Sequence, residues 1–78
     1  MGTVYVSRSQ ARRILSGLEK FRKILLDFDR VPNVGQAFAD EVFRVFQNRH
    51  PEISIVPIQM NKAVRFMVER AKANLPAL

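Results

Sequence analysis

The 78-residue chain contains no cysteine, which excludes a disulfide framework, thiolate chemistry and a zinc site built on cysteine. This absence fits a reducing cytoplasm, where we expect the protein to reside. No apolar run approaches the roughly 18 residues that a membrane-spanning helix needs. Residues 1–6 also lack the charged start and apolar core of a signal peptide. We therefore expect no association with a membrane.

Groups that perform catalysis are also scarce. The chain has one histidine, His50, which directly precedes Pro51. A catalytic role would need a nucleophile or a carboxylate beside it. Its place at the end of a predicted helix is explained more simply as a C-terminal cap that complements the helix dipole. Because no pair of nucleophile and base can be assembled, the sequence predicts neither an enzyme nor a cofactor.

The length and the apolar content indicate a small globular protein. A chain of 78 residues makes one domain, which we place over residues 1–78, as a whole protein or as a piece of a longer one. A domain of this size buries only about 60–65% of the surface that its unfolded chain exposes. The apolar content of 47% is normal for a globular protein and too high for a disordered one. We therefore expect one domain of marginal stability.

The whole chain has a formal net charge of +6. Its positive charge is concentrated in the first third of the sequence. Between residues 8 and 23, six basic residues stand against one acid, Glu19. Four of them fall opposite the apolar face of a predicted helix: Arg8, Arg12, Arg13 and Lys20. This basic face fits nucleic-acid phosphates, or else solvent and an acidic protein partner. Nucleic acid is the weaker alternative, because no groove-reading motif accompanies the charge.

The spacing of apolar residues predicts strands and helices in alternation. We predict strands over residues 3–6, 23–28 and 52–58, and helices over residues 8–21, 36–48 and 62–75. Ser7 and Gln10 match a capping box at the start of the first helix, and Asn61 is the expected cap of the third. Gly17 lies inside the first predicted helix. The run Ile24-Leu-Leu is apolar on both faces, as in a strand covered on both sides.

This order of elements predicts an α/β fold. The expected architecture is a three-stranded, mainly parallel sheet with three helices in the order β-α-β-α-β-α, because short helical crossovers join parallel strands. At least one edge of so small a sheet should be open, so a homodimer is an additional expectation.

The strand, turn and helix over residues 24–41 form the most informative part of the chain. In open α/β sheets, ligands and partners bind at the carboxyl ends of the strands. We therefore predict a partner-binding surface here, made by Asp29, Asn33, Gly35, Gln36 and Asp40. Gln36 is the first choice for a partner contact, since it is polar and flexible.

Two sharper interpretations of this segment have simpler alternatives. The N–H groups at Gly35 and Gln36 could bind an anion, but a tight turn that lets the helix pack close to the sheet is favoured. Four carboxylates could hold a cation such as magnesium: Asp27, Asp29, Asp40 and Glu41. The favoured alternative is that Asp27 and Asp29 shape the turn, while Asp40 and Glu41 solvate the N-terminus of the helix. No metal is therefore predicted.

The sequence also resembles a known family. The run Leu26-Asp-Phe-Asp-Arg-Val-Pro-Asn-Val-Gly-Gln-Ala-Phe-Ala-Asp-Glu-Val-Phe-Arg-Val-Phe resembles the bacterial STAS-like domains of unknown function, as do residues 6–15 and 50–53. That family is distantly similar to the STAS domains of anti-sigma-factor antagonists, which bind a histidine-kinase-fold ATPase and are phosphorylated by it on a serine. The resemblance implies a regulatory module that docks on an ATPase or a related signalling partner.

The chain departs from the antagonists at the phosphorylated turn. They carry an Asp-Ser-Ser-Gly type motif where this chain has Gly35, Gln36, Ala37 and Phe38. No serine, threonine or tyrosine occurs between residues 30 and 53. Because phosphorylation needs a hydroxyl, we predict that this turn is not a phosphorylation switch.

Overall fold

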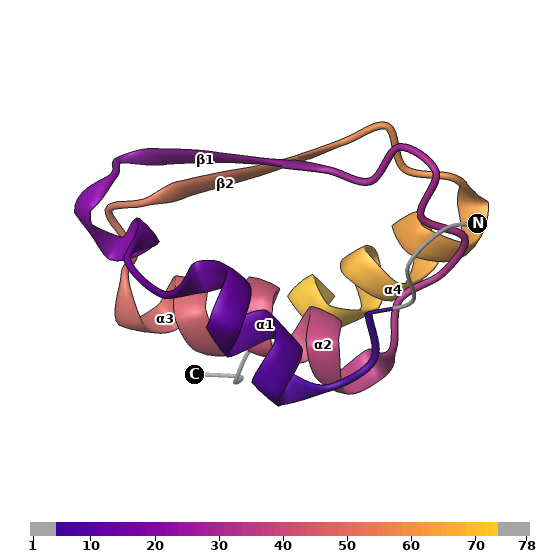
Figure 1. Cartoon of the computed structure of the whole chain (residues 1–78), viewed down its shortest axis with the longest axis horizontal. Coiled ribbons are helices and arrows are strands. Elements are labelled where there is room, and N and C mark those ends of the chain that lie inside the picture. Colours follow the sequence, from indigo (N-terminus) through magenta and orange to yellow (C-terminus); the bar gives the residue numbers. More distant parts are fainter. Residues whose placement is uncertain (1–4, 74–78) are drawn as a thin grey trace.

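Two parallel strands and one layer of helices make up the fold of this protein, for which the computed structural model describes residues 5–73 (Figure 1). The elements are α1 (Arg8–Leu15), the 3₁₀ turn η1 (Leu18–Lys20), β1 (Lys23–Asp27), α2 (Gln36–Asp40), the π-helical segment η2 (Glu41–Phe46), α3 (Gln47–Arg49), β2 (Ser54–Ile58) and α4 (Lys62–Ala73). The predicted α/β class is confirmed. None of the described helices is long and apolar enough to cross a membrane.

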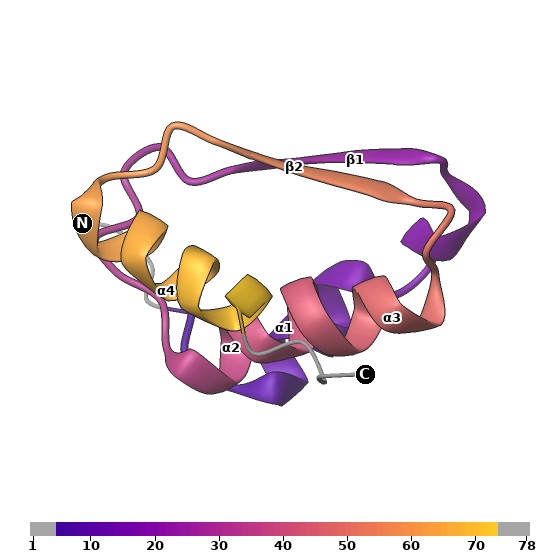
Figure 2. The ribbon, with the colours of Figure 1, turned by 180° about the vertical axis from the view of Figure 1, so that it is seen from behind.

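The sheet is covered on one face only. β1 and β2 pair in parallel, with Ile24 opposite Ile55 and Leu26 opposite Pro57. Figures 1 and 2 show all the labelled helices on the same side of these strands. Ile24 faces the helices and is buried, whereas Leu25 on the outer face is 59% exposed. The prediction that this strand is covered on both faces is therefore wrong, since all the helices of the described region lie on one side.

The predicted third strand is not part of the sheet formed by residues 5–73. Residues 3 and 4 of that prediction lie outside the described residues. Tyr5 forms an isolated parallel bridge with Val34, and the Gly35 N–H donates to the Tyr5 carbonyl oxygen at 2.7 Å. A Cβ at Gly35 would lie 2.7 Å from the Val6 Cα, so this pairing depends on glycine. The N-terminal segment thus pairs with the loop before α2 instead of with β1.

Helix α1 begins as predicted and ends early. The capping box is confirmed: the Gln10 N–H donates to the Ser7 Oγ at 3.1 Å, and the Ser7 N–H donates to the Gln10 Oε1 at 3.0 Å. The helix then stops at Leu15, because Gly17 adopts a left-handed conformation with φ 81°. Glycine ends helices in this way because it has no Cβ to clash. The prediction that the helix continues through Gly17 to residue 21 is wrong.

The second predicted helix is present over residues 36–49 as the continuous run α2, η2 and α3. Its middle is π-helical, a rare geometry that is frequent at functional sites. The apolar stripe of this run forms the centre of the core with residues of β2, α4 and the loop between α3 and β2: Phe38, Ala39, Val42, Phe43, Phe46, Ile53, Ile55, Val64, Val68 and Ala71. The last predicted helix is present as α4, which buries Val64, Val68 and Ala71. Residues 74 and 75 of that prediction lie outside the described residues.

Candidate functional site

The loop between β1 and α2 is fixed by buried valines and presents polar side chains. It leaves the end of β1 and crosses from the sheet to the helical layer (Figure 1). Val31 and Val34 are buried in the core, whereas Asp29 and Asn33 are exposed. The Asp29 N–H donates to the Asp27 Oδ1 at 2.9 Å, which shapes the turn as expected for an aspartate at this position. The loop is therefore anchored from below and displays its polar groups outward.

A hollow of about 570 Å³ lies where both strands end, and we refer to it as the carboxyl-end hollow. Its lining comes from two loops, residues 28–32 after β1 and residues 59–61 after β2. Asn61 joins these loops, because its Nδ2 donates to the carbonyl oxygens of Val31 at 3.2 Å and Pro32 at 3.1 Å. Its Oδ1 accepts from the Val64 N–H at 2.8 Å, which confirms Asn61 as the cap of α4. One side chain therefore holds both loops and the start of a helix.

Each strand is followed by a residue with a left-handed backbone. Arg30 has φ 64° and Gln59 has φ 58°. A residue with a Cβ pays roughly 1–2 kcal/mol for this conformation. Such backbone strain clusters at binding and active sites, where the surrounding structure enforces it. Sequence patterns did not reveal either residue as a site candidate, because no glycine or asparagine marks either position.

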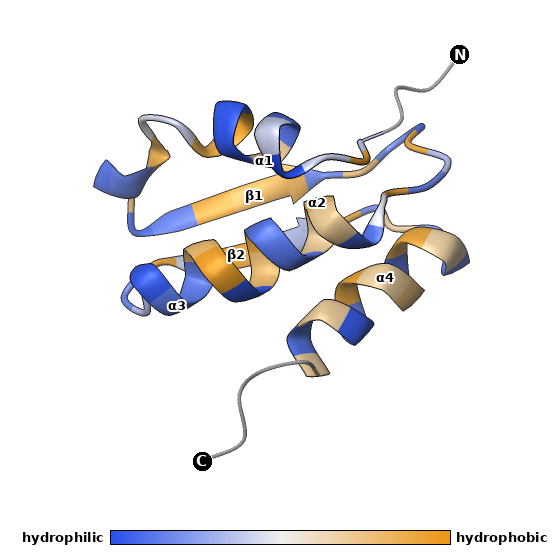
Figure 3. Ribbon diagram, turned by 90° about the horizontal axis from the view of Figure 1, so that it is seen from below, coloured by the Kyte–Doolittle hydropathy of each residue, from blue (hydrophilic) through white to orange (hydrophobic). Residues whose placement is uncertain are grey.

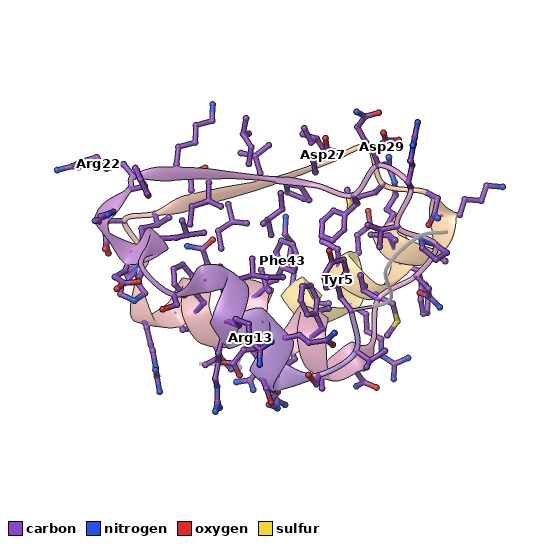
Figure 4. The ribbon with its side chains drawn as sticks, in the orientation of Figure 1. Tyr5, Arg13, Arg22, Asp27, Asp29 and Phe43 are labelled. Atoms are coloured by element: carbon purple, nitrogen blue, oxygen red, sulfur yellow. The ribbon has the colours of Figure 1, made fainter. Side chains whose placement is uncertain are left out.

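The predicted partner-binding residues lie in two places. Asp29 lines the carboxyl-end hollow at the level of the sheet (Figure 4), whereas Gln36 and Asp40 belong to α2 in the helical layer. Gln36 is exposed and borders a separate shallow hollow of about 390 Å³ together with Arg8, Ala37 and Asp40. The loop therefore presents polar groups at both of its ends, and the two hollows described here contain different members of the predicted set.

Asp40 and Glu41 meet three arginines in a compact ionic cluster made of Arg8, Arg12, Asp40, Glu41 and Arg44. The Asp40 Oδ2 lies 2.7 Å from the Arg8 Nη1 and 2.8 Å from the Arg44 Nη2, and the Arg44 Nε donates to the other Asp40 oxygen. These hydrogen bonds, that of Arg44 first, lower the pKa of Asp40 to about 2. The Asp40 carboxylate therefore stays ionised and is largely committed to its arginine partners.

Glu41 is the buried member of this cluster, at 5% exposure. Its carboxylate accepts hydrogen bonds from the Arg8 Nη1 and the Arg12 Nε, each at 3.3 Å. The interpretation that Glu41 solvates the start of a helix is therefore wrong, because its side chain packs between α1 and η2. The same contacts divide the predicted basic face: Arg8 and Arg12 are paired with acids, whereas Arg13 and Lys20 form no ion pair within residues 5–73.

The four carboxylates considered for a cation do not converge. Asp27 and Asp29 lie at the end of β1 (Figure 4), while Asp40 and Glu41 are held by arginines in the helical layer. No group of three side chains able to hold a metal ion occurs in the described part of the chain. The four carboxylates therefore lie in two separate groups.

Gly35 serves a close approach of two backbones. Its N–H donates to the Tyr5 carbonyl oxygen, and a Cβ would meet the Val6 backbone at 2.7 Å. Its φ of −77° is open to any residue, so space and not conformation requires glycine here. The favoured interpretation, a tight turn that lets the helix pack close to the sheet, is wrong, because Gly35 has an extended backbone and its close neighbour is the N-terminal segment.

Comparison with known proteins identifies one family. The sequence profile of a STAS-like domain of unknown function matches residues 10–65, from the middle of α1 into α4. The match includes both strands, the loop after β1 and the whole run from α2 to α3. No curated protein and no solved structure matches the chain. The family resemblance seen in the sequence is confirmed.

Proposed function

We propose that this chain, which belongs to the family of STAS-like domains of unknown function, is a regulatory module that binds a protein partner and performs no chemistry of its own. The observation that carries the proposal is the firmly held loop pair at the carboxyl ends of the strands. These loops are attached to the core by the buried Val31 and Val34 and expose polar side chains to solvent. They also contain Arg30 and Gln59, which have left-handed backbone conformations. Backbone strain of this kind clusters at ligand-binding and active sites, which supports a binding role for these loops.

The docking surface in this proposal runs from the carboxyl-end hollow to the start of α2. We assign it five exposed polar residues: Asp29, Arg30, Asn33, Gln36 and Gln59. Four of them stand on loops that Asn61, Val31 and Val34 fix to the core, and Gln36 begins α2, so a partner meets a surface that is ordered before binding. Pre-ordering of this kind reduces the entropy lost on association. Gly35 and Asp40, which we also predicted as contacts, support the surface from below through backbone packing and the ionic cluster.

The proposed partner is a histidine-kinase-fold ATPase or a related signalling domain. This class follows from the similarity of STAS-like domains to anti-sigma-factor antagonists. The mode of control differs, because no hydroxyl side chain occurs between residues 30 and 53. Phosphorylation adds its charge through a hydroxyl, so the α2 turn has no group to accept a phosphate. In this proposal the partner's own state, and not modification of this turn, decides when the complex forms.

The test is binding of a histidine-kinase-fold ATPase domain encoded beside this chain, measured by titration calorimetry. We expect the double substitution Asp29→Ala/Gln36→Ala to weaken binding about tenfold, which is roughly 1.4 kcal/mol. Both side chains are exposed, so the circular dichroism spectrum should not change. Glu69→Ala on exposed α4 is the matched control and should bind as the unaltered chain does. Absence of binding by the unaltered chain would refute the partner class, and equal binding by the double variant would refute the surface.

A further inference from the structure

The two edges of the sheet differ in what they offer to another strand. The Ser54 N–H donates to the Arg22 carbonyl oxygen at 2.8 Å, and the Phe28 N–H donates to the Ile58 carbonyl oxygen at 2.9 Å. In a parallel ladder with this register, the backbone groups of Lys23, Leu25 and Asp27 point away from β2. They are left without a strand partner, because the sheet formed by residues 5–73 contains only β1 and β2.

The outer edge of β2 is blocked by a proline. The residues of β2 that point away from β1 are Ile55 and Pro57, and proline has no N–H to donate. Proline on an edge strand is a common means of preventing further pairing. An added strand is therefore directed to the edge of β1.

Space for one more strand exists beside β1. Figure 3 shows α1 on the far side of β1 from β2, and Figure 1 shows α1 in the helical layer below the sheet. Between them lies a hollow of about 240 Å³, the β1-edge hollow, whose mainly apolar lining includes Ile14 of α1, Leu26 of β1 and Phe38 of α2. Ile14 is an exposed apolar residue, at 38% exposure, and its side chain contributes to this lining. A strand added to β1 would lie above α1 and close this hollow.

The charge around this edge is mainly positive. Four exposed basic residues lie on α1, on η1 and at the start of β1: Arg13, Lys20, Arg22 and Lys23. None of them forms an ion pair within the described residues, and the nearby acids are Glu19 and Asp27. Figure 4 shows Arg13 on the outer side of α1 and Arg22 pointing away from the sheet. A second copy of this chain would bring an equally basic α1 to the same place, which like charges oppose.

We propose that the free edge of β1 binds an extended, acidic segment of a partner protein, which joins the sheet as its third strand. Main-chain hydrogen bonds to Lys23, Leu25 and Asp27 provide the pairing, an apolar side chain enters the β1-edge hollow, and acidic side chains meet the basic margin. Phe28 lines both hollows, but none of the five residues assigned to the docking surface above lies at this edge, so the two proposals can fail separately.

The test uses a blocked peptide of alternating residues, Glu-Val-Glu-Val-Glu-Val-Glu, and amide hydrogen exchange of the ¹⁵N-labelled chain followed by NMR. We expect the exchange of the Lys23, Leu25 and Asp27 amides to slow about tenfold when the peptide is present at ten times its Kd. The Ile55 amide on the opposite edge should not change. The same peptide with lysine in place of glutamate is the control and should give no protection.

Two variants separate charge from packing. Arg13→Glu/Lys23→Glu should weaken binding of the acidic peptide about tenfold, and Ile14→Ala should weaken it about threefold by removing apolar contact in the hollow. Arg65→Glu, an exposed position on α4, is the matched control and should bind normally. The proposal is overturned if neither peptide slows these amides, if both do so equally, or if Arg13→Glu/Lys23→Glu binds as well as the control. If these amides become protected from exchange as the protein concentration rises, without any peptide, the edge binds a second copy of the chain. That result would also overturn the proposal.

Discussion

Glu41 carries its charge in a nearly buried position, while the arginines that pair with it stand closer to the surface. Arg8 and Arg12 return to water if Glu41 is replaced, but Glu41 cannot do so if both arginines are removed. An uncompensated buried charge is costly, whereas loss of a partner from a solvated charge is not. Removing the two arginines should therefore harm the fold more than neutralising the glutamate between them.

We predict that Arg8→Ala/Arg12→Ala, which leaves the buried Glu41 charge without partners, lowers the free energy of unfolding by about 2–3 kcal/mol. Glu41→Gln should lower it by about 1 kcal/mol or less. Urea denaturation at pH 7 measures both. Arg13→Ala is the control. Arg13 lies on the same helix and forms no ion pair within the described residues, so this substitution should change the free energy of unfolding little. The explanation fails if Glu41→Gln is the more destabilising substitution.

Asp40 gives the fold a dependence on acid pH. Its pKa is lowered from 3.8 to about 2 in the folded chain, chiefly by Arg44 and then by Arg8, so folding favours the ionised form. This contribution is present above about pH 4 and is lost as the pH falls through 2. Because both arginines are partly solvated, we expect it to be about 1 kcal/mol. Lowering the pH from 5 to 2 should reduce the free energy of unfolding of both the unaltered chain and Asp40→Asn. The reduction should be about 1 kcal/mol smaller in Asp40→Asn. Equal reductions in the two proteins would contradict the assignment.

Residue roles were predictable where the partner is local. Ser7 with Gln10, and Asn61 with the start of α4, form caps within three positions of the chain, so a short motif reveals them. The partners of Asp40 and Glu41 on α1 lie 29 to 33 positions away. These ion pairs depend on how α1 packs against α2 and η2, which are separated from it in the sequence by β1. The spacing of residues therefore could not predict them.

At the level of elements, two glycines define where segments end and meet, for different reasons. Gly17 has φ 81° with nothing within 4 Å of an added Cβ, whereas Gly35 has an ordinary φ and the Val6 backbone at 2.7 Å. We predict that Gly17→Ala costs about 1 kcal/mol from backbone strain alone. Gly35→Ala should cost about 2–3 kcal/mol, because the N-terminal segment must move and the bridge between Tyr5 and Val34 opens.

Thermal unfolding of both glycine variants measures this difference. Ser16→Ala, an exposed position beside Gly17 at the end of α1, is the control for a change of side chain without a change of backbone strain. If Gly17→Ala proves the more harmful change, the left-handed end of α1 is more important to the fold than the N-terminal bridge.

The types of the elements were more predictable than their ends and surroundings. The buried positions of α2 and η2 keep the i, i+3, i+4, i+7 spacing of an α-helix, as in Ala39, Val42, Phe43 and Phe46, so nothing in the sequence indicated a π-helical segment. Gly17 was placed inside a helix because the apolar spacing continues beyond it. The left-handed conformation of one residue overrode that spacing.

For the whole molecule, the positive net charge is less available than the composition suggests. Arg8, Arg12 and Arg44 are paired with acids, which offsets part of the positive charge that they would offer to phosphates. Nucleic acid remains the alternative function, through Arg13 and Lys20. We predict weak binding of generic DNA at low salt that disappears near about 150 mM salt and is reduced by Arg13→Glu/Lys20→Glu. A salt titration by fluorescence anisotropy checks this; tight binding that persists at that salt concentration would favour the alternative.

The central claim is that the carboxyl-end hollow and the start of α2 receive a protein partner. The most direct measurement is an NMR titration of the ¹⁵N-labelled chain with a neighbouring histidine-kinase-fold ATPase domain. We predict that the amide signals of residues 29–36 and 59–61 shift or broaden first, while those on the outer side of α4 stay in place. Perturbation confined to α4, or no perturbation at all, would contradict the claim.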